Sequence, residues 1–157
     1  MVNISGFLKK ENVILNIKSK TKDGALEEIV NKIDLTKEKK ELVLLSLKQR
    51  EVLGTTGIGS SIAIPHARSV VLNKLCLYVG LSRTGIEYDS MDGKPVYILF
   101  LIIAPPLDTS NQYLILLGKI ASLSKKLVRK KGYLKVENED QLIALIKKYE
   151  NDIEDEL

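Results

Sequence analysis

A stretch of fifteen residues, GTTGIGSSIAIPHAR from Gly54 to Arg68, concentrates the side chains of this protein that could do chemistry. It contains three glycines and the only histidine of the chain, His66. Glycine permits positive φ and lets backbone N–H groups approach a ligand closely. Four hydroxyl side chains add further hydrogen-bond donors: Thr55, Thr56, Ser60 and Ser61. Because Pro65 fixes φ just before His66, we expect an imidazole held at a strand edge beside a loop that binds an anion such as phosphate.

Known nucleotide loops and catalytic motifs fit this stretch poorly. Ser60 stands where a Walker-type loop needs its lysine, and Ile62 stands where a dinucleotide fingerprint needs its third glycine. A serine nucleophile at Ser60 or Ser61 has no recognisable carboxylate partner and no strand-to-helix elbow. One histidine and one cysteine leave no metal-binding pattern. We therefore expect no nucleotide, no metal ion and no other cofactor at this site.

Arg50 separates two interpretations of His66. An isolated histidine is also compatible with an ordinary, half-buried strand position whose glycine neighbours only turn the chain. Arg50 lies sixteen residues before His66, at the end of an expected helix, and its guanidinium is a permanent cation with a planar fork that suits phosphate. Histidine, glycine loop and arginine together predict a phosphohistidine site, with the hydroxyls of Thr56 and Ser60 as further phosphate-stabilising groups.

The segments around the loop alternate between strand-like and helical patterns. Strands are expected at Val13–Ile17, Ile62–Ile64, Leu75–Leu81 and Val96–Ile103, the last apolar on both faces. Helices are expected from Thr21, from Thr36 to about Glu51 with Leu42 and Leu45 facing inward, over Asn111–Lys126 and over Glu139–Tyr149. This order predicts an α/β fold in which residues 1–157 form a single domain, with a central sheet of about four to six strands and helices on both faces.

The composition limits the classes of function. With 157 residues, 45% of them hydrophobic and 28% charged, the chain suits one globular domain. Aromatic residues make up 5% and tryptophan is absent, so no surface that stacks nucleic-acid bases is expected. The net charge of +4 is compatible with an acidic partner or a phosphate ligand. A single cysteine, no leader pattern and no long apolar segment favour a cytoplasmic location without membrane insertion.

Several other residues are assigned structural roles. Cys76 lies in an expected strand and is interpreted as a small buried hydrophobe, not a reactive thiol. Asp89 and Asp92 are interpreted as turn residues near the site. A basic cluster is expected on a solvated face, with contact to an acidic partner as the alternative: Lys125, Lys126, Arg129, Lys130 and Lys131.

The histidine motif resembles the active-site signature of a known family. From Arg50, the pattern RxxxGTTGIGSSIAIPHAR is similar to that of the fructose- and mannitol-type IIA domains, including nitrogen-related ones, of the bacterial phosphoenolpyruvate sugar phosphotransferase system. The stretch GIEYDSMDGKPVYILFLIIAP, residues 85–105, and the helix from Asn111 also resemble that family. The resemblance implies a mixed sheet flanked by helices. It also implies that His66 accepts a phosphoryl group as a tele-phosphohistidine, with Arg50 as its basic companion.

One position departs from the family pattern. In the family, the helix that follows the turn at Pro105 and Pro106 usually begins with a second active-site histidine. This chain instead reads NQYL, with Tyr113 at that place. The resemblance implies that this histidine helps to stabilise the phosphorylated state. Tyr113 can donate a hydrogen bond but carries no positive charge at neutral pH. We therefore expect phosphorylation of His66 with an altered rate or choice of partner.

The resemblance implies a phosphotransferase component and leaves two functions open. The first is a phosphocarrier that takes a phosphoryl group from the HPr carrier protein and passes it to a IIB component during sugar uptake, in peripheral association with a IIC transporter. The alternative is a regulatory protein in which the phosphorylation state of His66 controls protein partners, as the nitrogen-related members imply. A third function, an inactive scaffold, conflicts with the presence of both Arg50 and His66.

Overall fold

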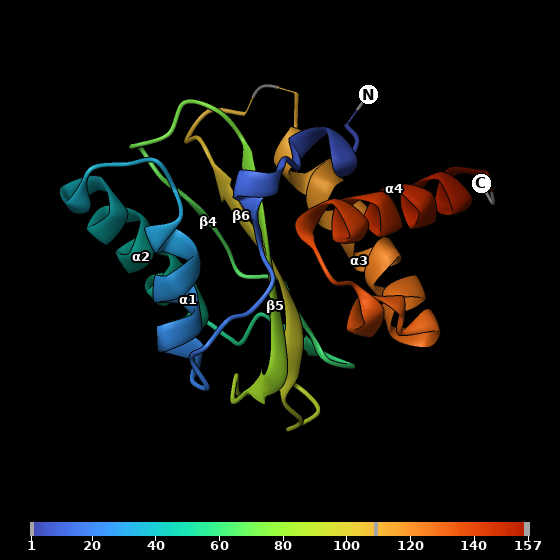
Figure 1. Cartoon of the computed structure of the whole chain (residues 1–157). Helices are drawn as coiled ribbons and strands as arrows, with labels where there is room; N and C mark the ends of the chain where they lie inside the picture. The colour runs from blue at the N-terminus through green and yellow to red at the C-terminus, as the bar shows by residue number, and fades with distance from the viewer. Residues whose placement is uncertain (1, 109, 156–157) are drawn as a thin grey trace.

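In the computed structural model, which describes residues 2–108 and 110–155, a mixed β-sheet lies between two layers of helices (Figure 1). The described strands are β1 (Val13–Ile14), β2 (Gly57–Gly59), β3 (Ile62–Ala63), β4 (His66–Arg68), β5 (Cys76–Ile86) and β6 (Val96–Ala104). The helices are α1 (Lys22–Asn31), α2 (Lys37–Val52), α3 (Gln112–Lys130) and α4 (Glu139–Asp155), with short 3₁₀ turns η1 (Ser5–Phe7), η2 (Lys10–Asn12) and η3 (Gly132–Lys135). Within these residues, no helix has both the length and the apolar character that crossing a membrane requires.

Strand β6 is the centre of the sheet because both of its faces are apolar. It pairs antiparallel with β5 on one side and parallel with β3 and β4 on the other, in the sheet order β1-β5-β6-β3-β2. Ile98, Phe100 and Ile102 belong to the core under α3 and α4, whereas Leu99 and Leu101 belong to the core under α1 and α2. All five side chains are fully buried. The prediction of an α/β fold with helices on both faces of a central sheet is confirmed.

Several expected boundaries differ from the observed ones. Strand β1 ends at Ile14, and β2 within the glycine loop was not expected. Strand β5 continues to Ile86 through Ser82, a position that resembles a connection in the sequence. The register shifts between Leu81 and Ile86, and the buried Ser82 hydroxyl accepts the N–H of Gly85. This irregularity hides the strand, because it interrupts the alternation of apolar and polar residues.

The inward face of α2 differs from the predicted one. Leu42 and Leu45, expected to face inward, are 49% and 52% exposed, so that prediction is wrong. Val43 and Leu47 are buried instead. With Arg50 they follow the spacing i, i+4, i+7, which places all three on one side of the helix. The stripe that packs α2 against the sheet therefore also directs Arg50 toward it.

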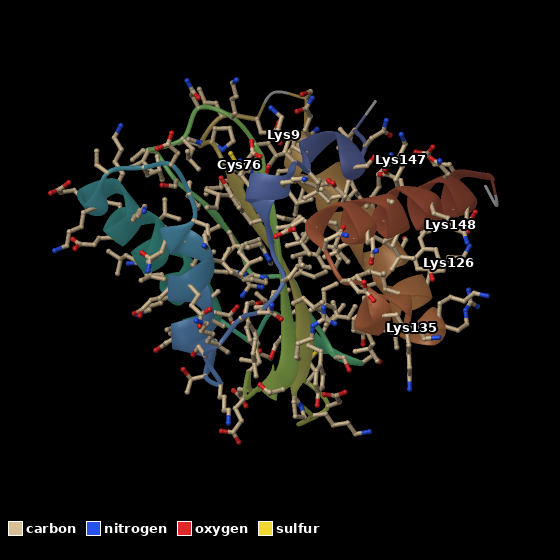
Figure 2. All side chains as sticks on the ribbon, viewed as in Figure 1. Lys9, Cys76, Lys126, Lys135, Lys147 and Lys148 are labelled. Carbon is tan, nitrogen blue, oxygen red and sulfur yellow. The ribbon has the colours of Figure 1, made fainter. Side chains whose placement is uncertain are left out.

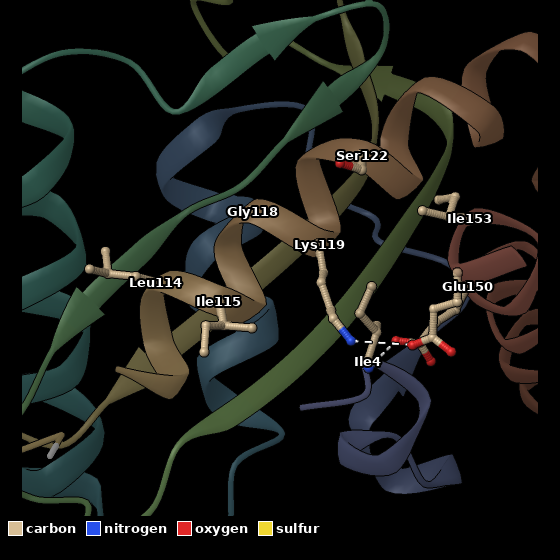
Figure 3. A pocket seen from close by; sticks show the side chains of 9 residues that line it. Ile4, Leu114, Ile115, Gly118, Lys119, Ser122, Glu150 and Ile153 are labelled. Atoms are coloured by element: carbon tan, nitrogen blue, oxygen red, sulfur yellow. Dashed lines mark hydrogen bonds and ion pairs between the residues drawn. The ribbon is translucent and has the colours of Figure 1, made fainter. Parts of the chain in front are cut away.

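The N-terminal segment is fastened to α4 by one buried carboxylate. Glu150 is 4% exposed and accepts the backbone N–H groups of Ile4 and Ser5 as well as the Ser5 hydroxyl, which lies at 2.9 Å. Lys119 of α3 donates to the carbonyl oxygen of Val2. Figure 3 shows Glu150 and Lys119 beside an apolar cavity of about 220 Å³ between α3, α4 and Ile4. These polar groups satisfy one another and hold the segment over the core.

We expect Glu150→Ala to lower the free energy of unfolding by about 2–3 kcal/mol, because three donors lose their acceptor in a buried place. Glu150→Gln should lose less, since its amide oxygen still accepts. Asn151→Ala is a control on the same helix, because Asn151 is exposed. Urea unfolding followed by circular dichroism measures all three. Equal stability of Glu150→Ala and Asn151→Ala would contradict this role of Glu150.

Candidate functional site

His66 and Arg50 meet where the end of α2 lies against β4. The Nδ1 atom of His66 is 2.7 Å from the carbonyl oxygen of Ile64, and its Nε2 atom is 3.3 Å from Nε of Arg50. A carbonyl oxygen only accepts hydrogen bonds, so Nδ1 carries the proton. A guanidinium only donates, so Nε2 presents its lone pair. The two partners therefore fix a neutral imidazole with Nε2 as its nucleophilic atom.

The local backbone explains this orientation. Strand β4 pairs with β6 so that His66 lies opposite Ile102, and the carbonyl of Pro65 accepts the N–H of Ile102 at 2.9 Å. Pro65 has no N–H and a fixed φ, which suits the bend between β3 and β4. The guanidinium is held from the other side, since Nη1 of Arg50 donates to the carbonyl of Gly54 at 2.9 Å. The side chains of His66 and Arg50 are thus both anchored to backbone carbonyl oxygens.

The surroundings keep His66 unprotonated. Burial lowers the pKa of His66 below its ordinary value, and the Arg50 cation lowers it further. The Ile64 carbonyl and the Glu51 carboxylate oppose this fall, because both favour the protonated ring. At neutral pH the ring is therefore a nucleophile with its lone pair available.

Tyr113 and Arg68 complete the surroundings of the imidazole. The rings of His66 and Tyr113 lie 6.0 Å apart between centroids, and the guanidinium carbon of Arg68 lies 4.9 Å from the centre of the Tyr113 ring. Nη1 of Arg68 donates to the carbonyl of Pro105 at 3.1 Å. Burial raises the pKa of the Tyr113 phenol against the opposing charges of Arg68 and Arg50, so the phenol keeps its proton at neutral pH. Tyr113 therefore lies next to both the imidazole and the Arg68 guanidinium.

Glu51, next to Arg50, holds the first half of the glycine loop. Its side chain is 8% exposed, pairs with Lys22 of α1 at 2.9 Å and accepts the N–H of Thr56 at 3.1 Å. The hydroxyls of Thr56 and Tyr88 also donate to this carboxylate. The Thr56 hydroxyl, which the sequence assigns to phosphate, is thus buried and occupied by an internal acceptor. Its contact with phosphate stays a prediction that requires these hydrogen bonds to change.

Asp92 holds the second half of the loop in the same way. Its carboxylate accepts the N–H groups of Ser60 and Lys94 at 2.9 and 3.0 Å, and both lower its pKa. Gly59 has φ +94°, in the region that favours glycine, and a side chain at Gly57 would lie 2.5 Å from the Ser90 hydroxyl. The loop is an anion cradle, but the anions in this structure are the protein's own carboxylates. Direct contact of Ser60 with phosphate stays a prediction.

Sequence reasoning found Arg50, His66 and Tyr113 but missed Arg68, Glu51 and Asp108. Arg68 lies two residues after His66 on β4, and this spacing places both on one face of the strand. That signal was available in the sequence. Asp108 accepts the N–H of Tyr113 at 2.7 Å and so holds the start of α3. Glu51 and Asp108 act through partners that only the folded chain brings near.

The remaining candidates offer no second reactive centre. Cys76 begins β5 and is half-buried, and burial raises the pKa of its thiol, so the thiolate is disfavoured. Asp92 lies in the turn that precedes β6, as predicted, where the N–H of Gly93 donates to the carbonyl of Ser90. Among the described residues, no group of three His, Cys, Asp or Glu side chains is placed to hold a metal ion.

Comparison with known proteins adds to this geometry. Residues 6–149 match the family described as "Phosphoenolpyruvate-dependent sugar phosphotransferase system, EIIA 2". The chain is 31% identical over 151 residues to the "PTS system fructose-specific EIIABC component" of Bacillus subtilis (strain 168). That match covers 95% of this chain and 24% of the relative, so the chain spans about a quarter of the relative's length.

Solved structures agree with the fold. The crystal structure of nitrogen regulatory protein IIA-Ntr from Neisseria meningitidis has a TM-score of 0.81 at 25% identity, covering 91% of this chain and 98% of that one. The complex of enzyme IIAMTL and phosphorylated enzyme IIBMTL from Escherichia coli gives 0.69 at 19% identity, covering 88% and 96%. The second likeness shows the fold alone.

We expect the pKa of His66 to lie below its ordinary value of about 6.5, and Arg50→Gln to raise it, because the substitution removes a nearby cation. A ¹H–¹³C NMR titration of the imidazole measures both, with the remote, exposed Arg129→Gln as the control. Since the unfolded chain binds this proton more tightly, stability should fall as the pH falls through the pKa of folded His66. A pKa at or above the ordinary value would contradict the neutral imidazole.

Proposed function

This chain belongs to the EIIA 2 family of the phosphoenolpyruvate-dependent sugar phosphotransferase system, and we propose from that premise that it carries a phosphoryl group on Nε2 of His66. One observation carries the proposal. The Nδ1 proton of His66 is held by the Ile64 carbonyl, which leaves the Nε2 lone pair toward Arg50. A neutral imidazole nitrogen beside a fixed cation is what attack on a phosphorylated donor requires.

The proposed donor is the phosphohistidine of an HPr-type carrier protein. The Nε2 lone pair of His66 attacks the phosphorus, the bond between phosphorus and the donor nitrogen breaks, and the donor imidazole keeps that electron pair. Arg50, which now donates to Nε2, then donates to a phosphoryl oxygen, because the lone pair has become a bond. The Ile64 carbonyl stays on the Nδ1 proton throughout. The protein supplies positioning and charge stabilisation, and the transfer needs no nucleotide or metal.

We assign the task of the family's second histidine to Arg68 and Tyr113 together. The Tyr113 ring lies 4.9 Å from the Arg68 guanidinium carbon and 6.0 Å from the His66 ring, so Tyr113 links a permanent cation to the imidazole. In the described part of the chain, the Tyr113 phenol oxygen has no hydrogen-bond partner, and it is a protonated donor at neutral pH. A phosphoryl group on His66 would gain a cation from Arg68 and a hydroxyl from Tyr113. With Tyr113 in place of the family's second histidine, Arg68 then supplies the positive charge at the site.

For the phosphocarrier we propose a IIB component as the acceptor, peripheral association with a IIC transporter, and a cytoplasmic location. Support comes from the fructose-specific name of the Bacillus relative and from the complex in which a mannitol IIA protein is bound to phosphorylated IIB. In this proposal residues 1–157 act as one IIA domain. The apolar side chains of Val52 and Leu53, 86% and 84% exposed after Arg50, give a partner a surface beside the site.

A regulatory role is the second candidate. The likeness to nitrogen regulatory protein IIA-Ntr favours it, since that structure covers 91% of this chain with the higher TM-score. In this function the phosphoryl group stays on His66 and changes which proteins bind. The two functions share the site and differ in whether a IIB component removes the phosphoryl group.

Incubation with phosphoenolpyruvate, the general phosphotransferase proteins and no ATP should add one acid-labile phosphate to the chain. Intact-mass spectrometry measures the gain, because one phosphoryl group adds a fixed mass. His66→Ala should show no gain, whereas Cys76→Ser, which removes the other candidate nucleophile, should match the wild type. Equal gains in wild type and His66→Ala would overturn the assignment of His66. Adding a IIB component afterwards should remove the label if the protein is a carrier and leave it if the protein is a regulator.

We expect Arg68→Gln to slow phosphoryl acceptance about ten-fold to a hundred-fold, which corresponds to one lost charge-assisted contact of roughly 1.5–3 kcal/mol. Rapid-quench measurement with phosphorylated HPr gives the rate. Arg129→Gln, at the far end of α3, is the matched control with the same change in charge and should keep the wild-type rate. If Arg68→Gln matched this control, Arg68 would have no part in transfer.

A further inference from the structure

The C-terminal end of α3 and the turn after it form a basic surface with an exposed leucine. We call this surface the basic tip, and its residues are Arg129, Lys130, Lys131, Leu134 and Lys135. All five are exposed, and Leu134 is 48% exposed although it is a large apolar side chain. Figure 2 shows Lys135 at the lower end of the α3 and α4 layer. The tip therefore combines four cations with one apolar side chain.

The backbone of the tip is held in place, so the exposure of Leu134 is fixed. The guanidinium of Arg83 on β5 donates to the carbonyl oxygens of Leu134 and Val136 at 3.2 and 2.6 Å. Tyr133 and Val136 on either side are 3% and 7% exposed and belong to the core. Because Tyr133 and Val136 are both anchored in the core, the Leu134 side chain stays on the outer side of the turn. Leu134 is therefore presented at the surface next to the four cations.

Neighbouring carboxylates do not neutralise the tip. Asp140 at the start of α4 pairs with Lys10 at 3.2 Å, and Asp152 of α4 pairs with Lys126 at 3.7 Å. Lys126, expected on a solvated face with the rest of the cluster, is in fact buried. Across residues 2–108 and 110–155, no carboxylate forms an ion pair with the four cations of the tip, and Glu137 is the nearest acidic residue in the sequence.

The dipole of α3 accounts for only part of this arrangement. Cations in the last turn of a helix are favoured by its partial negative charge, which explains Arg129 and Lys130. Lys135 and Leu134 lie beyond the helix in η3, where that effect has ended. Solubility alone would explain the exposed cations but not the exposed leucine among them. The combination suits a partner with negative charge over an apolar layer.

We propose that the basic tip docks on the surface of an anionic lipid bilayer. The four cations lie over the headgroups, and Leu134 reaches the boundary between headgroups and acyl chains. Long lysine side chains suit a fluid array of charges without fixed positions. Nucleic acid fits less well because Tyr133, the aromatic residue of η3, is buried and cannot stack on bases.

This docking leaves the proposed phosphorylation site open. Helix α3 has 19 residues, and at 1.5 Å per residue it separates Tyr113 at its start from the tip by roughly 25 Å. His66, beside Tyr113, therefore lies near the opposite end of α3 from the tip, away from the docking surface. The basic tip is a second surface of the molecule, and its docking does not depend on phosphorylation of His66.

Co-sedimentation with phosphatidylcholine vesicles, with and without phosphatidylglycerol, tests the docking on the full chain. Binding is expected only with phosphatidylglycerol and should weaken as salt rises, because the attraction is screened. Arg129→Gln, Lys130→Gln and Lys135→Gln together should weaken it on the order of a hundred-fold, at about five-fold per charge. The matched control replaces exposed Lys18, Lys20 and Lys32 by glutamine and should keep most of the binding. Equal loss in both triple variants would overturn the assignment to the tip.

A tryptophan reporter tests the position of Leu134, because the natural chain has none. Leu134→Trp should show a blue shift of its fluorescence with phosphatidylglycerol vesicles and none with phosphatidylcholine alone. Leu45→Trp is the control, since Leu45 is similarly exposed on α2. The same shift for both variants, or none for Leu134→Trp, would contradict docking through the tip. Tighter binding of a single-stranded oligonucleotide than of the vesicles, at the same salt, would overturn the choice of a lipid surface.

Discussion

The hydrogen bond from Nδ1 of His66 to the carbonyl oxygen of Ile64 is the constraint on which the proposed chemistry depends. It decides which ring nitrogen holds the proton and therefore which one can form a bond to phosphorus. The backbone fixes the bond, because Ile64 and His66 flank Pro65 at the junction of two strands that both pair with β6. The central strand of the core thus sets the tautomer of the only histidine. Arg50, on the packed side of α2, faces the other nitrogen.

Negative and positive side chains occupy different parts of the site. The carboxylates of Glu51 and Asp92 are turned into the glycine loop, where backbone N–H groups and Lys22 hold them. The guanidinium of Arg50 contacts the imidazole, and that of Arg68 lies against the neighbouring Tyr113 ring. Acidic groups near His66 therefore stabilise the loop, and the cations stay available for an incoming anion. This division explains how a loop rich in N–H donors can stay folded without bound phosphate.

Patterns in the sequence predict the larger features of this protein. Periodicity, spacing or family likeness predict the α/β fold, the buried strand before Pro105, and the approach of Arg50 to His66. What the sequence could not reveal depends on contacts between distant segments. The bulge near Ser82 hides half of β5, and the exposed side of α2 cannot be read from a run in which Leu42, Val43 and Leu45 are equally apolar. The internal partners of Thr56 likewise come from α2 and the segment after β5.

The most direct test of the central claim is to identify the phosphorylated atom. A sample labelled with ¹⁵N-histidine is phosphorylated by phosphoenolpyruvate through the general phosphotransferase proteins, and long-range ¹H–¹⁵N correlations then identify both ring nitrogens of His66. Our account predicts that Nε2 is bonded to phosphorus and that Nδ1 keeps its proton, because the Ile64 carbonyl holds that proton before and after transfer. Phosphorylation on Nδ1, or a ring that remains unmodified, would contradict the account.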